Sequence, residues 1–547
     1  MERSERQTGE RLTSWKRIAR YLEKGERTVR RWAAEDGLPV HKVSNRPNSS
    51  VYAYPEEIDA WLASGTRQRN SETKKIQRTR PLLAVLPFSH TADVEEGLAH
   101  GLLIETISAI GQISGIDVIA RTSVMRYAGA NHSVAEIGAE LGVQFILEGS
   151  VETEGDLARI HVHLIAVEDQ AQTWNRTFDR ELSSKMLMQQ NVALEVAQQV
   201  RTIVTRQAST ADDPPVGQPV YLSGPAAEHY YAGRFLLNKY SPSALRESVA
   251  AFERAIELEP RFGPAYGGKA EALQLLTNFS FLPPAEVMGD AMVAINQAVA
   301  FSPNSAEVFA SLGYIHSTYT FDWEAAEEAF RQSLALNPSL ATSYQWLAEM
   351  LALLGRFDEA LERVSMAKRF DPMSPAVDGS YGHVLWLARR YDELIPSMEN
   401  LLRKAPENPL TYRLLFSGYF EQGLYAEAYA ICEKAVAIGD DPRQLALLGE
   451  LCLGANGEPE RIDRCLAMLE EEGANSFVSG FQFALMHTIR GNKVAALENL
   501  EKACDQSVWH VAMVGQCAMF DSLRSEPRFD RLLRRIGLYE SRFVAVD

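Results

Sequence analysis

The stretch Phe330-Arg331-Gln332-Ser333-Leu334-Ala335-Leu336-Asn337-Pro338 decides the fold, because an apolar helical pattern ends there in a proline. Proline cannot continue the interior of a helix, so it indicates the turn after a helix. The same residue returns at Pro372 and Pro406, each 34 residues further on. A second series of small or apolar residues keeps that spacing and lets helices approach closely: Ala326, Ala360, Leu394 and Ala428. The sequence therefore predicts stacked helix pairs in an all-α solenoid.

The 34-residue spacing resembles that of tetratricopeptide repeats (TPR), which we expect over residues 223–545. In such a solenoid neighbouring helix pairs supply each other's core, and the superhelix leaves a concave surface. The resemblance implies that this surface binds a protein or peptide. Tyr314, Tyr344 and Tyr381 either line the groove or fill the space between helices, and the sequence leaves both interpretations open. We also expect the repeats to fold independently of residues 1–200.

Charge is distributed unevenly along the 547 residues. Residues 1–80 hold 18 Lys+Arg against 11 Asp+Glu, a net charge of +7, whereas the whole chain carries −17. The remaining residues therefore carry −24. A basic head on an acidic body indicates that the head meets a polyanion and that the body does not.

Cysteine usage and hydropathy indicate the compartment. The five cysteines are sparse and form no CxxC pair, so we expect reduced thiols packed as small apolar residues. The N-terminus lacks the apolar core of a signal peptide, and no apolar run approaches the roughly 18 residues that cross a bilayer. We expect a cytoplasmic protein without membrane contact.

Residues 12–65 show the order helix, turn, helix, hairpin, helix. The order resembles the winged helix-turn-helix of the MerR and excisionase families. The residues that carry the resemblance are Ile18-Ala19, Leu22, Arg27-Thr28-Val29-Arg30-Arg31-Trp32, Leu38-Pro39 and the closing helix from Tyr54 to Leu62. The family's turn usually has glycine where this chain has Glu23, and often serine where it has Gly25. The resemblance implies binding to double-stranded DNA.

Arginines dominate one side of the expected second helix. Val29 and Trp32 stand three apart and share the inward face, so the arginines project on the other side. The candidate DNA-binding residues, including two on the hairpin, are Arg27, Thr28, Arg30, Arg31, Lys42 and Arg46. So short a module buries little surface, and we expect two copies, a homodimer, on a repeated or palindromic site. The other interpretation is an exposed arginine-rich helix without a nucleic-acid partner.

From Leu82 the pattern changes to α/β over residues 82–207. We expect buried strands at 82–86, 116–120 and 144–147, helices at 94–110, 134–141 and 184–206, and antiparallel strands around Val151 and 160–167. This part resembles the N-terminal domain of TolB-like and FlgO-like proteins. The strings that carry the resemblance are Leu86-Pro87-Phe88, Val118-Ile119-Ala120-Arg121-Thr122-Ser123, Leu147-Glu148-Gly149-Ser150-Val151 and Trp174-Asn175. The resemblance implies a fold more than an activity.

No catalytic constellation is evident. Gly149-Ser150 lacks the GxSxG context of a nucleophile elbow, and Gly267-Gly268-Lys269 lacks the remaining residues of a phosphate loop. His161 and His163 alternate on one strand face, where a polar sheet surface is the better interpretation than a metal site. We expect neither enzyme activity, nor a metal, nor a cofactor.

The predicted fold class is therefore multidomain: a small winged helix-turn-helix, an α/β domain with a mixed sheet, and a long TPR solenoid. Three polar segments complete the division, a disordered tail at 1–11 and linkers at 66–81 and 208–222. The leading hypothesis is a bacterial-type DNA-binding transcriptional regulator whose solenoid receives a protein or ligand signal. The alternative is a scaffold or adaptor whose winged helix contacts proteins.

Overall fold

A computed structural model describes residues 12–22, 29, 33, 38–42, 51–55, 57–58, 80–91, 94, 96–113, 115–129, 132–182, 185–204, 225–237, 241–278, 282–406, 408–437 and 442–538. The chain divides into two compact units, Met1–Arg80 and Pro81–Asp547. The predicted α/β domain and the predicted solenoid therefore belong to one unit. No helix in the described ranges combines the length and the apolar character that crossing a bilayer requires.

The first unit contains a short helix, α1 (Trp15–Tyr21), and an antiparallel hairpin, β1 (His41–Lys42) and β2 (Val51–Tyr52). Helix α1 begins at Trp15, because the preceding Ser14 side chain accepts a hydrogen bond from the Arg17 amide at 3.2 Å. The unit has a core of its own, formed by Ile18, Ala19, Val29, Leu38, Val51, Ala53 and Ile58. The predicted hairpin and the inward-facing Val29 are confirmed.

The second unit opens with a mixed sheet in the order β5-β3-β6-β7-β8, in which β4 also pairs with β6. Strands β3, β4, β5 and β6 pair in parallel, whereas β6, β7 and β8 are antiparallel. Their bounds are β3 (Leu82–Val85), β4 (Ser89–His90), β5 (Asp117–Val118), β6 (Phe145–Glu154), β7 (Leu157–Ala166) and β8 (Gln172–Glu181). Strand β3 lies between β5 and β6 and is fully buried, as its wholly apolar sequence predicts.

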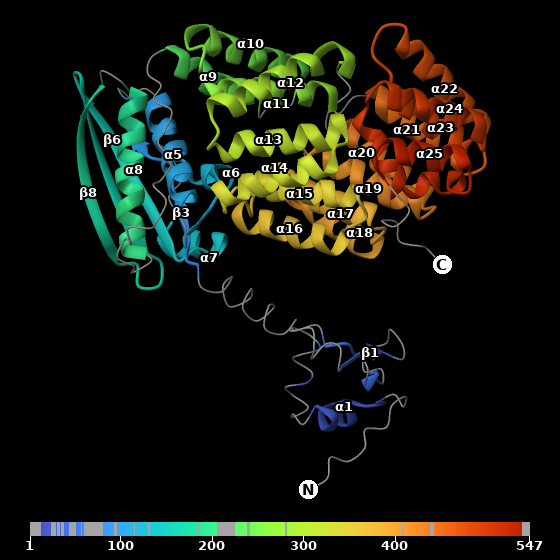
Figure 1. Cartoon of the computed structure of the whole chain (residues 1–547), viewed down its shortest axis with the longest axis horizontal. Helices are drawn as coiled ribbons and strands as arrows, with labels where there is room; N and C mark the ends of the chain where they lie inside the picture. Colours follow the sequence, from blue (N-terminus) through green and yellow to red (C-terminus); the bar gives the residue numbers. More distant parts are fainter. Residues whose placement is uncertain are drawn as a thin grey trace. The chain divides into compact units, whose positions relative to one another are not determined.

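Four helices and one 3-10 turn complete this α/β domain. They are α5 (Glu96–Gly111), α6 (Arg121–Val124), the turn η1 (Met125–Tyr127), α7 (Val134–Leu141) and α8 (Lys185–Val204). Helix α7 has the bounds predicted from sequence, because Ser133 and Glu136 form a capping box and Gly142 ends the helix in the left-handed region at φ 68°. Helices α5 and α8 pack against each other (Figure 1).

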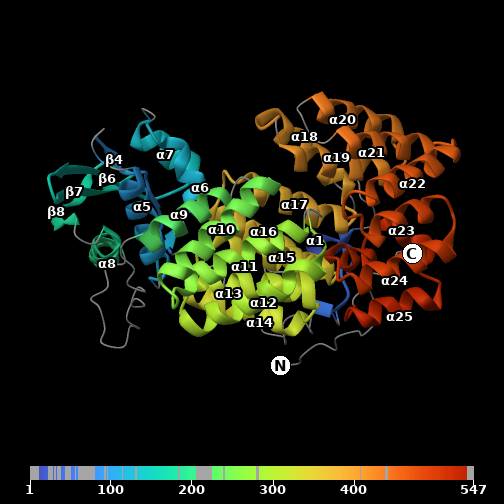
Figure 2. The ribbon, with the colours of Figure 1, turned by 90° about the horizontal axis from the view of Figure 1, so that it is seen from above.

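Helix pairs α9 to α24 follow, as Figures 1 and 2 show. The pairs are α9 (Pro225–Leu237) with α10 (Pro242–Leu258), α11 (Gly263–Asn278) with α12 (Pro284–Phe301), α13 (Ala306–Ile315) with α14 (Trp323–Leu336), α15 (Ala341–Leu353) with α16 (Phe357–Phe370), α17 (Pro375–Leu387) with α18 (Tyr391–Lys404), α19 (Pro409–Glu421) with α20 (Tyr425–Ala437), α21 (Pro442–Ala455) with α22 (Glu460–Gly473) and α23 (Gly480–Ile489) with α24 (Lys493–Asp505). A π-helical turn, η3 (His316–Thr320), extends α13. Two 3-10 segments, η4 (Trp509–Gly515) and η5 (Ala518–Leu523), and a last helix, α25 (Pro527–Arg535), end the unit.

The proline series predicts the helix ends correctly. Pro338, Pro372 and Pro406 each stand two residues after the last residue of α14, α16 and α18. The second series is fully buried at the helix contacts: Ala326, Ala360, Leu394 and Ala428 are each 0% exposed. The first helix of a pair also lies close to the second: a Cβ added at Gly313 of α13 would lie 3.0 Å from the Phe330 ring of α14. The predicted repeat solenoid is confirmed.

The α/β domain is bonded to the repeats. The Val118 amide donates to Ser339 Oγ at 3.1 Å, and the Ala120 amide donates to the Phe370 carbonyl at 2.7 Å. Arg369 on α16 forms a 2.7 Å ion pair with Asp117, whose side chain is almost completely buried. The independence expected between residues 1–200 and the repeats is therefore wrong for the α/β domain, because the edge strand β5 finds its polar partners on the solenoid.

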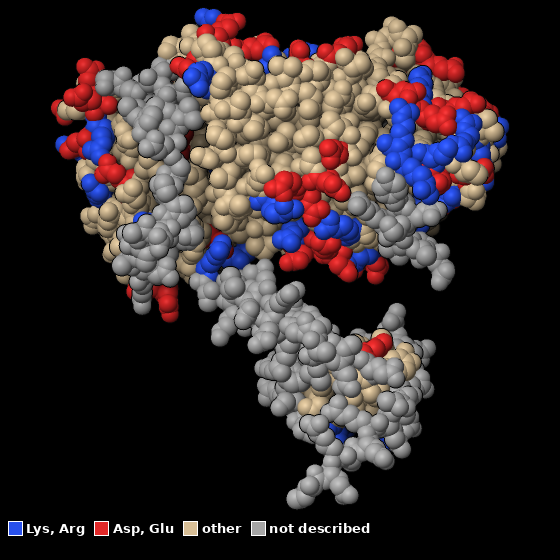
Figure 3. Space-filling view, viewed as in Figure 1, with Lys and Arg blue, Asp and Glu red and all other residues tan. Residues whose placement is uncertain are grey.

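Basic side chains gather over the last helices on the face shown in Figure 3. Many of them are paired with carboxylates: Arg528 with Glu501, Arg534 with Asp530 and Arg535 with Asp505, at 2.7, 2.8 and 2.7 Å respectively. The apolar side of α25 is buried through Phe529, Leu532 and Leu533. This helix therefore covers the end of the stack with a charged outer face.

Candidate functional site

The candidate DNA-binding residues lie almost entirely outside the described residues. Arg27, Thr28, Arg30, Arg31 and Arg46 are not described. Lys42 is described through its backbone, which pairs with Val51 in the hairpin. The burial of Val29 agrees with the face assignment on which the arginine prediction depends, and the DNA interface stays a prediction.

The described part of the hairpin carries a small aromatic cluster. His41 stacks on Tyr52 with a ring separation of 5.1 Å and lies 6.0 Å from the Tyr54 ring. The His41 Nε2 atom also lies 2.7 Å from a carboxylate oxygen of Glu57. Helix, hairpin and closing segment are therefore linked through side chains as well as through the core.

The C-terminal segment of the chain contacts the C-terminal ends of several first helices of the repeats. The Trp509 indole donates to the Asn278 carbonyl at 3.0 Å, and the Gln516 amide donates to the Leu353 carbonyl at 3.4 Å. Arg389 binds both carboxylate oxygens of Asp521 at 2.6 Å. The segment that contains η4 and η5 thus contacts the ends of α11 and α15 and the turn after α17. No periodic pattern in the sequence predicts this segment.

The tyrosines proposed either as groove or as core residues pack between helices. Tyr314 stacks on Trp346 with ring centroids 4.4 Å apart, and Tyr344 lies 5.6 Å from the Phe370 ring. Tyr381 is half-buried against the same solenoid core. The structure favours the core interpretation for all three.

A cavity of about 920 Å³ lies where the α/β domain meets the repeats. Its walls are α5, α8, the β5–α6 turn, α9, α11, the loop before α13 and the loop before α15. The Tyr231 hydroxyl of α9 donates to the Glu105 carboxylate of α5 at 3.0 Å and so bridges the two walls. The sequence did not single out this junction.

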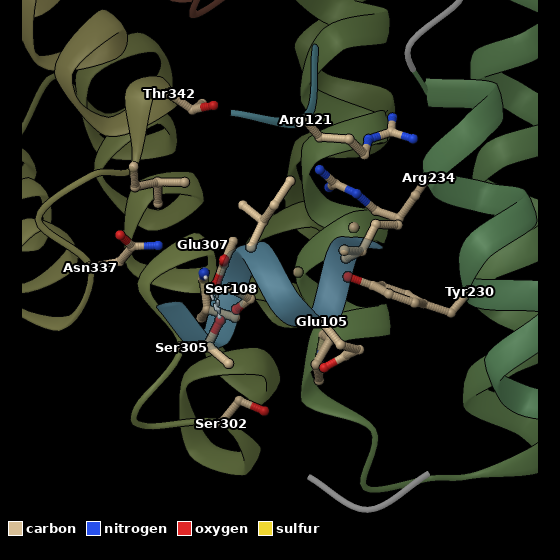
Figure 4. A pocket seen from close by; sticks show the side chains of 18 of the residues that line it. Glu105, Ser108, Arg121, Tyr230, Arg234, Ser302, Ser305, Glu307, Asn337 and Thr342 are labelled. Carbon is tan, nitrogen blue, oxygen red and sulfur yellow. Dashed lines mark hydrogen bonds between the residues drawn. The ribbon is translucent and has the colours of Figure 1, made fainter. Parts of the chain in front are cut away.

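The charged groups of the cavity are close to one another. Figure 4 shows the guanidinium groups of Arg121 and Arg234 side by side. Arg234 forms a 2.8 Å ion pair with Glu271, and Arg121 donates to His100 Nε2 at 2.5 Å. Burial, followed by the like charge of Arg234, lowers the pKa of Arg121. Burial raises the pKa of Glu105 to about 7, and the nearby Glu307 carboxylate adds to that rise.

Two sequence signals for the cavity were present. Arg121 follows directly after a predicted buried strand, within the string Val118 to Ser123 that carries the TolB/FlgO-like resemblance. Glu105 is a single carboxylate within the apolar helical run Leu102 to Ile110. Each signal alone is weak, and the two walls lie far apart in the sequence.

The two histidines considered for metal are exposed and engaged across strands. His161 Nδ1 lies 2.9 Å from Thr177 Oγ1, and His163 Nδ1 lies 3.1 Å from Gln172 Nε2. Over the ranges described above, no group of three or more His, Cys, Asp or Glu side chains is placed to hold a metal ion. All five cysteines are buried and form no disulfide, which confirms their packing as apolar residues.

Comparison with protein families gives two matches. Residues 79–195 match the second domain of HilA/YgeH-like transcriptional regulators, and residues 322–375 match a tetratricopeptide repeat family. The TPR resemblance is therefore confirmed, and the α/β domain is similar to a regulator domain. The MerR/excisionase-like and TolB/FlgO-like resemblances stay predictions.

Individual relatives are similar over parts of their length. The chain is 32% identical over 128 residues to a Rhizobium meliloti protein named "Putative adenylate cyclase 3", covering 23% of this chain and 22% of the relative. It is 19% identical over 303 residues to the transcriptional regulator HilA of Salmonella paratyphi A, covering 55% of this chain and 52% of HilA. The matches thus span about a fifth of the first relative and half of the second. Among solved structures, human IFIT1 in complex with PPP-AAAA has a TM-score of 0.37 at 16% identity, covering 58% of this chain and 79% of that one.

Proposed function

We propose that the chain is a DNA-binding transcriptional regulator whose N-terminal module binds double-stranded DNA and whose repeats receive a protein partner. The observation that carries the proposal is the order of its parts. A basic module with its own core precedes a HilA/YgeH-like second domain, and TPR repeats follow that domain. The relative HilA is named as a transcriptional regulator, which supports the same role here.

Charge supports the assignment of DNA to the first unit. Phosphate contacts from Lys and Arg supply much of the affinity of a DNA-binding protein, and residues 1–80 carry a net charge of +7. In this proposal Arg27, Arg30 and Arg31 enter or flank the major groove, and Lys42 and Arg46 bind phosphate or the neighbouring minor groove. A homodimer on a two-part site and a cytoplasmic location belong to the same proposal, as does the absence of enzymatic activity.

The test is a titration of the full-length chain against a pool of random duplexes at low and physiological salt. Arg30→Ala should weaken specific binding by about 1–3 kcal/mol if its guanidinium reads a guanine edge. Lys42→Ala should weaken binding to all sequences alike and lower the salt slope by about one. Arg331→Ala, an exposed arginine on α14, is the control and should change neither quantity.

Two outcomes are decisive. Enrichment of particular duplexes together with salt-sensitive binding supports the regulator. The absence of both overturns it and leaves the scaffold or adaptor, in which the N-terminal module contacts protein.

A further inference from the structure

The cavity at the junction has the size and composition of a small-molecule site. Ligand pockets in proteins measure roughly 300–1,000 Å³ and combine apolar walls with a few polar groups, and this cavity measures about 920 Å³. Apolar lining comes from Leu194, Tyr230, Phe262 and Phe301. An organic molecule in the cavity could therefore make both apolar contacts and hydrogen bonds with its walls.

Arg121 is the most unusual group in the cavity. Among the residues that the structure describes, no carboxylate forms an ion pair with it, and its hydrogen-bond partner is the His100 ring. The neighbouring Arg234 forms an ion pair with the Glu271 carboxylate. Two guanidinium groups side by side repel each other, and an anion placed between them would relieve that repulsion while forming charge-assisted hydrogen bonds.

The wall that faces the arginines offers uncharged hydrogen-bonding groups. The Ser302 hydroxyl is buried at the cavity wall, and the described residues provide it with no hydrogen-bond partner. The side chains of Ser108, Asn337 and Thr342 also line the space (Figure 4). Burying a polar group without a partner costs free energy, so a ligand that bonds to Ser302 would recover that cost.

We propose that this cavity binds a small organic anion, with Arg121 and Arg234 holding its carboxylate or phosphate group and the aromatic residues covering its body. The site lies between the α/β domain and the first repeats, because α5 and α9 both line it. Its occupant therefore contacts both parts and stabilises their joint. The proposal does not depend on DNA binding.

The test measures binding of two matched pairs of probes to the full-length chain by calorimetry and by thermal unfolding. AMP and adenosine differ by the phosphate, and benzoate and benzyl alcohol differ by the charge of one group. At least one anion should bind and raise the Tm, whereas its neutral counterpart should not. The phosphate and carboxylate arms then distinguish the two kinds of anionic group.

Variants place the binding at this cavity. Arg121→Met should weaken binding of the anion about tenfold or more, because it removes a charge-assisted hydrogen bond. Arg121→Lys, which keeps the charge, should retain part of the affinity and guards against a variant that merely misfolds. Arg126→Met is the control, since Arg126 pairs with Glu140 at 2.9 Å and does not line the cavity. Binding by neither anion, or equal binding by the wild type and folded Arg121→Met, would overturn the proposal.

Discussion

Arg369→Met should loosen the joint between the α/β domain and the solenoid. The Arg369 Nη2 atom lies 2.7 Å from Asp117 Oδ2, and the side chain of Asp117 is 4% exposed against 28% for that of Arg369. Removing one partner of a fully buried ion pair typically costs 3–5 kcal/mol, because the remaining charge stays buried. Water reaches the arginine end of this pair, so we expect a loss of about 2–3 kcal/mol in the free energy of unfolding.

The assay is urea unfolding of the full-length chain followed by circular dichroism, with Arg331→Met as the control. Arg331 forms an exposed pair with Glu328 one turn away on α14, so its replacement should change the free energy of unfolding by less than about 0.5 kcal/mol. The double variant Asp117→Asn/Arg369→Met should recover at least about 1 kcal/mol of the loss, since no charge then stays buried. If Arg369→Met and Arg331→Met are indistinguishable, the ion pair does not stabilise the joint and the reasoning fails.

Three further outcomes are expected. Ala360→Phe should lower the free energy of unfolding by about 1–3 kcal/mol, because Ala360 of α16 is 0% exposed where α16 packs on α15. Hydrogen exchange should then rise in the adjacent repeats and also at residues 117–123. The control Val293→Phe, at a position that is 63% exposed, should leave exchange unchanged. Exchange that rises in the repeats alone would contradict the bonded joint. Burial raises the pKa of Glu105 from 4.5 to about 7, and the residue faces Tyr231, Glu307 and Gln190. Between these two pH values the folded state keeps a proton that the unfolded state has lost. The free energy of unfolding is therefore unaffected by this group below pH 4.5 and falls by about 3 kcal/mol as the pH rises through 7. Glu105→Gln should remove that loss, so equal urea midpoints of variant and wild type at pH 8, after matching at pH 4.5, would refute the assignment. Phe330→Ala should cost about 3–5 kcal/mol, measured by the same unfolding assay, since the ring is 0% exposed; a loss under about 1 kcal/mol would show that the site collapses around the smaller side chain.

Local features were predictable from the sequence because their causes are local. The prolines fix helix ends through a missing amide and a steric clash with the preceding turn, and each stands two residues beyond its helix. Helix α7 was bounded correctly because its Ser133 cap and Gly142 terminator act on their own backbone. The alternating residues of β6 and β7 likewise predicted antiparallel strands with one buried face.

The cavity and the joint were not predictable, because their partners come from distant segments. Asp117 and Arg369 are 252 residues apart, and Val118 and Ser339 are 221 apart. Periodicity identifies which face of a helix is apolar, but it does not say which other surface covers that face. The sequence therefore does not distinguish Arg121 from other charged residues that follow a strand, because its neighbour Arg234 comes from the distant helix α9.

The contacts between the C-terminal segment and the earlier repeats limit how the number of repeats can change. TPR arrays stack units that contact only their neighbours, so in principle a unit can be gained or lost by duplication or deletion. Here the indole of Trp323 donates to the Ile536 carbonyl across 213 residues, and that of Trp509 donates to the Asn278 carbonyl across 231. One added 34-residue unit between these partners would move them apart by a whole helix pair. These contacts therefore fix the number of repeats between the paired residues. Related chains should differ in the length of their loops rather than in their number of helix pairs.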